Sequence, residues 1–315
     1  IPAEEIERRR DFREYDIVTI DGETARDFDD AVWVDRLENG NFVLQVHIAD
    51  VSHYVVVGSA LDAEARNRGT SIYFPDRAVP MLPGELSTDI CSLNPKQDRL
   101  VMSALLEIDR KGQVVKAEFC EGVIRSAARM TYTKVFAILE GDKALRQEYA
   151  PLIDRFELMR DLAMILNRRR KRRGSIDFEI AEAEIEFDDL GKMTGVVRSE
   201  RNTAHRIIEE LMLAANEAVA THLAPLGNAS LYRVHEKPEA KRVLEFEQLA
   251  HSFGYSLGVE VLVRRFGRTH RRRDGAKSRK NAVVADTNID ISPRDYQKLI
   301  KQIEGKPEER ILSFL

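Results

Sequence analysis

Two strand-turn-strand segments constrain the fold of this chain more than any other feature. The runs AVWVDRL and NFVLQVHIADVSHYVVV flank the turn ENGN, and the runs VMSALLEI and VVKAEFCEGVI flank DRKGQ. All four runs are rich in β-branched and aromatic residues, which is typical of antiparallel hairpins. We therefore expect strands over residues 31–37, 41–57, 101–108 and 114–124.

Helical periodicity dominates much of the remaining chain. Residues 131–173 carry apolar residues at helical spacing and end in a basic turn before Gly174. A second amphipathic helix begins near Asn202 or Thr203, either of which is a candidate N-cap. The motif ISPRDY predicts a third helix start, with Ser292 as cap and Pro293 in its first turn.

Hairpins alternate with these long helices, which predicts the α+β class with mixed or antiparallel sheets. Residues 175–198 return to strand alternation about the turn DDLGK. Between the first two hairpins, the segment GTSIYFPDRAVPMLPGELS is interrupted by three prolines and a second glycine. Such punctuation predicts an ordered loop in place of a regular element.

The composition indicates a soluble, cytoplasmic protein with a sizeable core. The chain has 315 residues, of which 43% are hydrophobic and 32% charged. Its apolar runs are shorter than the roughly 20 residues of a membrane span, and the start IPAEEIERRRDF lacks a signal-peptide core. Cys91 and Cys120 form no CxxC pair, which argues against a disulfide framework or zinc ribbon and favours a reducing compartment.

Basic residues are concentrated in two blocks, although the net charge is -4. One block is RRRKRR, Arg168 to Arg173, and the other spans Arg264 to Lys280 with nine Lys or Arg against Asp274 alone. Such blocks can bind phosphates. A solvated helix face for the first block and a mobile loop for the second are equally open interpretations.

The segment TIDGETARDFDDAV places four aspartates within ten residues of one another, beside apolar runs. Carboxylates crowded next to a buried strand are costly unless a cation neutralises them. Strand geometry would point them to both faces, so they converge only if the segment wraps as a loop. Hard oxygen ligands suit one or two Mg²⁺ ions and phosphodiester hydrolysis. A solvated acidic turn is the alternative, and an EF-hand is rejected because its sixth-position Gly is missing. The aspartates are Asp21, Asp27, Asp29 and Asp30.

Five motifs in a fixed order resemble the catalytic domain of the ribonuclease II and ribonuclease R family. They are TIDGETARDFDDAV, VHIADVSHYV, GTSIYFPDRAVPMLP, GSIDF and RIIEELMLAANEAVA. The resemblance covers most of residues 11–256 and implies a ribonuclease II-type α+β catalytic domain. It also implies a Mg²⁺-dependent, processive 3'-5' exoribonuclease that degrades single-stranded RNA, fed into a deep channel, to nucleoside 5'-monophosphates.

The resemblance assigns roles to individual residues by motif. It implies that Asp21, Asp27 and Asp30 hold metal and that Asp29 is the catalytic carboxylate. It further implies that Tyr73 and Phe178 contact the last RNA bases and that Glu210 lies near the terminal ribose. Judged without the resemblance, the two aromatic residues read as core and Glu210 as the flank of a buried helical stripe.

The run HIADVSH contains His47, Asp50 and His53 at a spacing that suggests zinc. On a continuous strand the two histidines would share one face and Asp50 would point to the other. We therefore expect a structural role for this run, within the central sheet.

Departures from the family pattern set expectations for the domain organisation. We expect a single, partial catalytic domain over residues 1–315, truncated before the family's C-terminal arginine motif, with a basic, mobile insertion at 258–290. The family's cold-shock and S1 RNA-binding barrels are absent from this sequence. An RNA-binding module of the same fold that cannot cleave is the alternative to an active enzyme.

Overall fold

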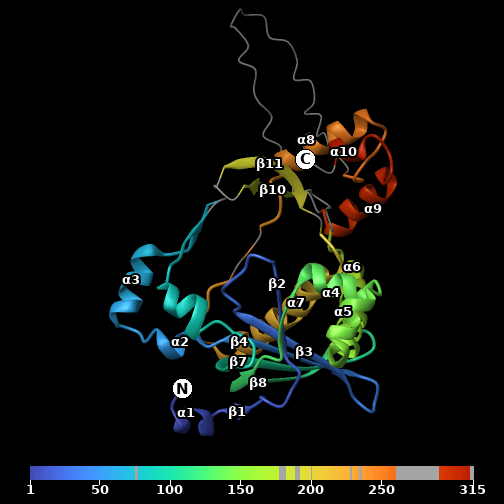
Figure 1. Ribbon diagram of the computed structural model, residues 1–315. Helices are drawn as coiled ribbons and strands as arrows, with labels where there is room; N and C mark the ends of the chain where they lie inside the picture. Colours follow the sequence, from blue (N-terminus) through green and yellow to red (C-terminus); the bar gives the residue numbers. More distant parts are fainter. Residues whose placement is uncertain are drawn as a thin grey trace, which may run out of the picture. The chain divides into compact units, whose positions relative to one another are not determined.

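The computed structural model describes most of the chain as two compact units (Figure 1). The first unit contains Ile1–Arg169 and Ala181–Ser230, and the second contains Arg170–Ile180 and Leu231–Leu315. Each unit is considered by itself below, and the expected single domain over residues 1–315 stays a prediction. The described residues are 1–74, 77–176, 182–188, 192–199, 201–227, 229–232, 234, 236–259 and 291–312.

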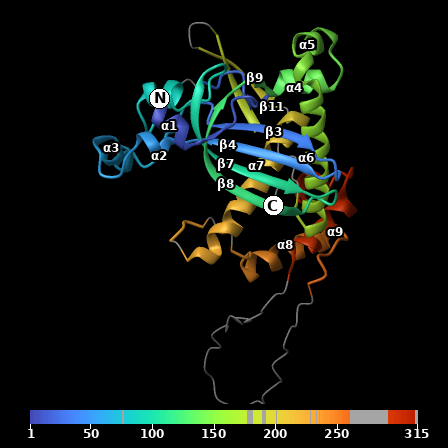
Figure 2. The same ribbon diagram turned by 90° about the horizontal axis from the view of Figure 1, so that it is seen from below.

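A seven-stranded mixed sheet forms the centre of the first unit (Figure 2). Its spatial order is β1-β8-β7-β4-β3-β2-β9, in which β1 pairs with β8 and β2 with β9 in parallel while the other neighbours are antiparallel. The α+β class with a mixed sheet is thereby confirmed. The strands are β1 (Arg10–Asp11), β2 (Val18–Asp21), β3 (Asp30–Arg36), β4 (Phe42–Ala49), β7 (Asp98–Ile108), β8 (Val114–Arg125) and β9 (Ala128–Thr131).

Both expected sheet hairpins are present, but the second strand of the first one ends early. Strand β4 stops at Ala49, and the Asp50 side chain accepts a hydrogen bond from the backbone N–H of His53 at 3.2 Å. This bond caps a short helix, α2 (Val51–Tyr54), so the predicted strand over residues 41–57 is too long. A local side-chain cap has overridden the β propensity of the apolar run.

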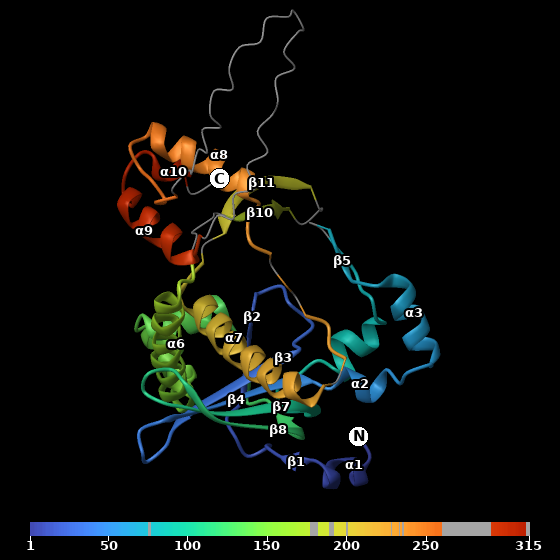
Figure 3. The ribbon, with the colours of Figure 1, turned by 180° about the vertical axis from the view of Figure 1, so that it is seen from behind.

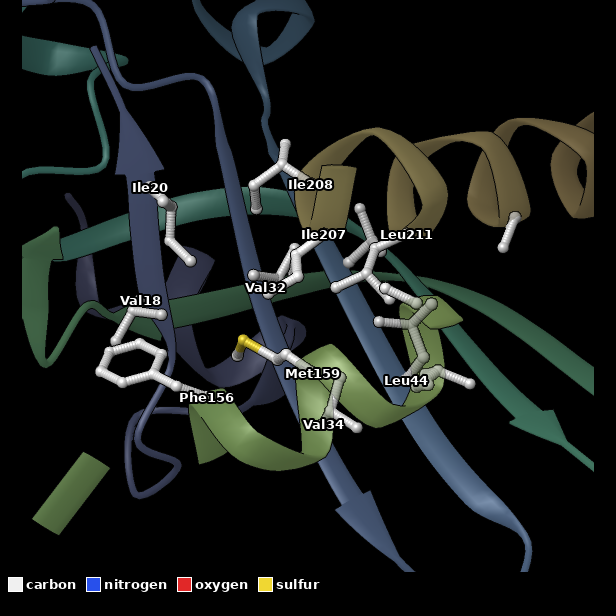
Figure 4. Close-up of a cluster of buried hydrophobic side chains, with 14 of the residues drawn as sticks. Val18, Ile20, Val32, Val34, Leu44, Phe156, Met159, Ile207, Ile208 and Leu211 are labelled. Atoms are coloured by element: carbon white, nitrogen blue, oxygen red, sulfur yellow. The ribbon is translucent and has the colours of Figure 1, made fainter. Parts of the chain in front are cut away.

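Three helices cover one face of the sheet and enclose the main core. They are α4 (Tyr132–Leu139), α6 (Ile153–Arg173) and α7 (Thr203–Leu223), and α7 lies obliquely across the strands (Figure 3). Alternate residues of β2 and β3, such as Val18 and Val32, point toward them, together with Leu44 of β4 (Figure 4). Asn202, one of the two candidate N-caps, caps α7 through its side chain, and Thr203 is the first helical residue.

The opposite face of the sheet carries a second hydrophobic cluster. Its buried members include Ile17, Phe28, Trp33 and Leu93, so the stretch after β2 and the segment around residue 93 meet on this face. The residues of β2 and β3 therefore alternate between two cores, which fixes the pairing register because a slip of one residue would exchange the faces.

Smaller elements surround the sheet in the first unit. The segment expected to be a loop contains a short hairpin and a π-helical turn, with Pro75 and Asp76 outside the described residues. Residues 182–199 form the hairpin predicted from strand alternation. The elements are α1 (Ala3–Arg8), α3 (Ala60–Arg68), β5 (Ile72–Tyr73), β6 (Ala78–Val79), η1 (Glu85–Ile90), α5 (Lys143–Glu148), η2 (Ala150–Leu152), β10 (Glu182–Phe187), β11 (Met193–Ser199) and η3 (Ala224–Leu226).

The second unit is helical in its described part. It holds α8 (Ala240–Ser252), α9 (Pro293–Ile303) and α10 (Glu309–Leu312) around a small apolar core. Ser292 and Asp295 form a capping box at the start of α9, which confirms the predicted helix start. None of the helices within the described ranges is long and apolar enough to cross a membrane.

Candidate active site

The four aspartates of the acidic segment lie on and between two neighbouring strands. Asp21 is the last residue of β2 and Asp30 the first residue of β3, and residues 22–29 between them are irregular. The segment thus leaves the sheet as a loop, which is the condition the sequence sets for all four carboxylates to approach one another. Asp27 and Asp29 are exposed, whereas Asp21 and Asp30 are half-buried.

Backbone hydrogen bonds fasten the second half of this loop to two distant segments. The Ala49 N–H donates to the Asp29 carbonyl at 2.9 Å, and the Leu93 N–H donates to the Phe28 carbonyl at 2.7 Å. The Ser92 hydroxyl accepts from the Phe28 N–H at 3.0 Å. Because the Phe28 ring is buried, with 5% exposure, the loop is anchored by a side chain as well as by its backbone.

Arg129 of β9 holds the first half of the loop. One guanidinium nitrogen lies 2.8 Å from the Glu23 carbonyl oxygen, 3.2 Å from that of Ala25 and 3.5 Å from that of Gly22. The guanidinium carbon also sits 4.9 Å from the centre of the Phe28 ring, at the distance of a cation–π contact. The loop is therefore held from both sides, by β9 and by the segment around Ser92.

The carboxylates interact electrostatically. Burial, followed by the charges of Asp30, Asp29 and Asp27, raises the pKa of Asp21 to about 7, while Arg129 acts in the opposite direction. Burial and the charge of Asp29 raise the pKa of Asp30 to about 6. Asp29 is exposed at its surface, yet partial desolvation by the surrounding protein raises its pKa as well. Negative charge in this loop is undercompensated, a condition that a bound cation would relieve.

The donor chemistry of the site fits a hard divalent cation. All four side chains offer carboxylate oxygens, and the buried Oδ2 of Asp21 has no hydrogen-bond partner among the described residues. Within the described chain, no three or more His, Cys, Asp or Glu side chains are arranged closely enough to hold a metal ion, and this includes the four aspartates. Asp21, Asp27 and Asp30 remain the predicted ligands.

Tyr132, at the start of α4, extends the site toward helix α7. Burial and the charges of Asp21 and Asp30 raise the pKa of its phenol to about 12. Its ring stacks on His205 with centroids 4.0 Å apart, and His205 belongs to the capping box of α7. The N-terminal end of α7 therefore lies beside the aspartates.

The predicted RNA-binding residues occupy different surroundings. Tyr73 lies on the β5–β6 hairpin with 73% of its surface exposed. Glu210 is only 2% exposed on α7, where its Oε1 accepts a hydrogen bond from the Asn167 side chain at 2.7 Å. Phe178 lies outside the described residues, as does the basic stretch at 264–280. The roles of all three side chains stay predictions.

Only His47 of the histidine motif lies in the central sheet as expected, because β4 ends at Ala49 and places Asp50 and His53 at and within α2. His47 is fully buried on β4, where its ring nitrogens lie 2.8 Å from the Ser103 hydroxyl and 3.1 Å from the Gln45 side chain. Burial lowers its pKa to about 3, so it is neutral. Asp50 binds Arg9 at 2.7 Å and His53 lies on α2, so the three side chains do not converge.

The other basic block, Arg168 to Arg173, forms the C-terminal end of α6. Positive charge at this end is favourable, because the last carbonyl groups of a helix carry partial negative charge. This placement supports the helix-face interpretation and leaves phosphate contact as a prediction.

Comparison with known proteins places this arrangement in a family. Residues 9–315 match the model of the RNB domain. The chain belongs to the RNB family. A relative of this RNB chain, Ribonuclease R of Aquifex aeolicus (strain VF5), is 41% identical over 315 residues, which are 100% of this chain and 41% of the relative.

Solved structures agree with this family. Mycoplasma genitalium RNase R in complex with ribose methylated single-stranded RNA matches the RNB chain with a TM-score of 0.82 at 28% identity, over 100% of this chain and 45% of that one. Mycoplasma genitalium RNase R in complex with double-stranded RNA matches with a TM-score of 0.81, again at 28% identity. This match covers 100% of this chain and 51% of that one. The RNB chain thus spans about half or less of the length of these proteins.

Three residues that contribute to the site carry no signal in the sequence. Arg129 and Ser92 lie outside the acidic segment and form hydrogen bonds with its backbone, and Tyr132 lies within the electrostatic influence of Asp21 and Asp30. Arg129 lies within a short run of ordinary strand residues, and Ser92 is one serine among many. The TY pair at 131–132 reads only as a helix start. The pairing of β2 with β9 would have pointed to Arg129, because Thr19 and Arg129 are register partners.

Proposed function

We propose that this RNB chain carries the catalytic centre of a Mg²⁺-dependent exoribonuclease. The enzyme removes nucleotides processively from the 3' end of single-stranded RNA and releases nucleoside 5'-monophosphates. One observation carries the proposal: four aspartates whose charges act on one another lie on a single fastened loop, in a chain of the RNB family. The RNA complexes of the Mycoplasma relative support RNA as the partner.

In this proposal three of the four aspartates bind metal and the fourth is catalytic. Asp21, Asp27 and Asp30 would hold one or two Mg²⁺ ions, which would supply charge stabilisation at the phosphate and a more acidic water. Asp29 is proposed as the catalytic residue by its motif, and its exposure to solvent and the hydrogen bond from Ala49 to its carbonyl are consistent with this role. Water attacks the terminal phosphodiester, the 3' oxygen of the preceding nucleotide leaves as a hydroxyl, and the nucleoside 5'-monophosphate departs.

Aromatic stacking explains how such an enzyme accepts any sequence. Every base has a π face, and stacking on an aromatic ring contributes about 1 to 3 kcal/mol per base. The exposed Tyr73 is available for this contact on its hairpin. Phe178 is proposed as the second stacking ring by its motif.

Glu210 is proposed to accept a hydrogen bond from the 2'-hydroxyl of the terminal ribose, which would distinguish RNA from DNA. Its burial and its bond to Asn167 also support a second role, the packing of α7 against α6. The proposed location is the cytoplasm, which is consistent with the free thiols of Cys91 and Cys120.

The proposal is tested by incubating the chain with Mg²⁺ and a single-stranded oligoribonucleotide labelled at its 5' end. Stepwise shortening from the 3' end, with release of mononucleotides, is the expected result. A DNA oligonucleotide of the same sequence serves as the control and should stay intact. RNA that is retarded in a gel but never shortened would overturn the enzyme and support the cleavage-incompetent RNA-binding module.

A further inference from the structure

Arg129 has a set of contacts that neither the fold nor the predicted ligands explain. It lies on the edge strand β9, which pairs in parallel with β2 so that Arg129 is opposite Thr19. Register partners project to the same face of a sheet, and Asp21 lies two residues beyond Thr19, on that face too. The backbone therefore places the guanidinium beside the first predicted metal ligand.

The guanidinium binds three carbonyl groups in the first part of the loop. The carbonyl oxygens of Gly22, Glu23 and Ala25 all lie within 3.5 Å of a single nitrogen. Hydrogen bonds from a charged donor are roughly twice as strong as neutral ones, so this contact fixes the backbone path immediately after Asp21. Residues 22–29 are irregular, so their backbone path is not fixed by helix or strand hydrogen bonds.

The same guanidinium connects the loop to the buried ring that anchors it. Its carbon lies 4.9 Å from the centre of the Phe28 ring, whose backbone is bound by Ser92 and Leu93. Arg129 thus contacts the beginning of the loop through carbonyls and its end through an aromatic face. A lysine could supply the charge and donate to the carbonyls, but it lacks the planar guanidinium that lies over the Phe28 ring at the same time.

Three buried polar atoms in this place lack hydrogen-bond partners within the described part of the chain. They are the Nε of Arg129, the Oγ1 of Thr19 and the Oδ2 of Asp21. Buried polar atoms are nearly always paired in folded proteins, so these three atoms on adjacent strands are places where water or an ion completes the hydrogen bonding. The orphaned Nε belongs to the arginine and the orphaned Oδ2 to the predicted ligand.

We propose that Arg129 is a positioning residue for the metal-binding loop. By holding the carbonyls of Gly22, Glu23 and Ala25 and the Phe28 ring, it fixes the backbone from which the loop aspartates project toward a divalent cation, without itself touching substrate. The inference rests on the proposed function, whose ligands it serves. Supporting residues around metal ligands typically change metal affinity by 10- to 100-fold when they are replaced.

The test measures Mn²⁺ binding to the metal-free chain by calorimetry, without RNA, in Arg129→Met and Arg129→Lys. Arg129→Met should weaken Mn²⁺ binding by about tenfold or more, and Arg129→Lys by less, because lysine keeps the charge. Hydrogen exchange should rise at residues 22–29 and stay unchanged in β4 and β7. In the RNA assay, excess Mn²⁺ should restore the rate of Arg129→Met.

Arg155→Met is the matched control. Arg155 also places its guanidinium over an aromatic ring, 4.9 Å from the centre of Trp33, and donates to the carbonyl of Val34 at 3.3 Å, but it does not contact the loop. Its loss should leave Mn²⁺ affinity at the wild-type value.

Two results would overturn the inference. One is Mn²⁺ affinity of Arg129→Met and Arg129→Lys equal to that of the wild type. The other is faster exchange spread across the whole first unit, as general destabilisation would produce. If Arg129→Met does not fold, the Mn²⁺ affinity of Arg129→Lys decides. A wild-type chain whose Mn²⁺ affinity depends on Arg129 but which cuts no RNA would overturn the proposed function alone.

Discussion

At the scale of single residues, the four aspartates differ more in surroundings than in chemistry. Asp21 is half-buried at a strand end and lies under the influence of the three other carboxylates, whereas Asp29 is exposed on the loop. Burial and neighbouring charges shift the pKa of a buried carboxylate, whereas an exposed carboxylate is accessible from solution. The two positions therefore call for different measurements.

Asp29→Asn should reduce RNA cleavage by at least about a hundredfold, since it removes one carboxylate charge from the proposed metal site. RNA affinity should stay close to that of the wild type, because the aromatic and basic contacts are unaltered. Single-turnover cleavage and filter binding measure the two quantities. Asp35→Asn, near the C-terminal end of β3, is the control and should cleave normally. Full activity of Asp29→Asn would refute its assignment.

Asp21→Asn should stabilise the metal-free protein above pH 7. The pKa of Asp21 is about 7 in the folded protein, against about 3.9 for Asp in an unfolded chain. The folded state therefore binds more protons between these values, and the free energy of unfolding should fall as pH rises from about 4 to 7. Asparagine removes this dependence and should raise stability at pH 7.5 on the order of 2 kcal/mol.

Urea unfolding in EDTA at pH 5 and pH 7.5 measures this effect. Asp27→Asn, an exposed aspartate of the same loop, should give a smaller gain. The prediction is wrong if the wild-type stability is the same at both pH values or if Asp21→Asn is no more stable than the wild type at the higher one.

At the scale of elements, the site depends on short connections between regular strands. The β5–β6 hairpin presents Tyr73 with 73% exposure, and the loop at 22–29 presents the aspartates. Loops carry function when a rigid scaffold positions them, and here the seven-stranded sheet is that scaffold.

Tyr73→Ala should lengthen the final RNA fragment that the enzyme cannot shorten further. Loss of one stacking face removes about 1 to 3 kcal/mol of binding per base, so short products should dissociate earlier. Denaturing gels of a 5'-labelled substrate measure the end product, and the Mg²⁺ requirement should not change. Phe178→Ala should behave in the same way. Ile72→Ala, an exposed aliphatic neighbour on the hairpin, is the control. An end product of unchanged length in Tyr73→Ala would return this ring to a structural role.

Local patterns predicted most elements and the acidic loop, since strand alternation, helical spacing and caps are encoded within a few residues. The hairpin β3–β4, the cap at Asn202 and the start of α9 at Ser292 and Pro293 all follow from such patterns. The end of β4 was missed, because Asp50 acts both as a cap and as the partner of Arg9, which lies far away in sequence.

The surroundings of the aspartates could not be predicted for the same reason. Arg129 lies 104 to 107 residues away from the carbonyls it binds, and Ser92 lies 64 residues from Phe28. Only the pairing of strands brings these residues together, and a pattern read along the sequence contains no information on which edge strand joins β2. The metal ligands were assigned by a motif, whereas their supports require the fold.

At the scale of the whole molecule, the chain separates into a sheet-based unit that holds the aspartates and a small helical unit. Glu247 is buried in the second unit, where its carboxylate accepts from the Ser256 hydroxyl at 2.5 Å and from the Leu257 N–H at 2.7 Å. These bonds tie the end of α8 to the chain that follows it.

Glu247→Ala should destabilise the second unit while leaving the metal site intact. Removing the acceptor of two buried donors costs about 1 to 3 kcal/mol. Hydrogen exchange should increase in α8 and α9, and Mn²⁺ affinity should equal that of the wild type. Glu245→Ala, exposed on the same helix, is the control and should alter neither quantity. Weaker Mn²⁺ binding in Glu247→Ala would show that the site depends on both units.

Because residues distant in sequence hold the acidic loop, its sequence alone does not determine its shape. The four carboxylates lie within a stretch of ten residues, so the whole ligand set could be copied as a short peptide or grafted into another turn. The atoms that shape it come from Ala49, Ser92, Leu93 and Arg129, which such a copy leaves behind. The motif is therefore short in sequence, but its shape depends on residues from distant segments. One of these segments is β9, at the edge of the sheet.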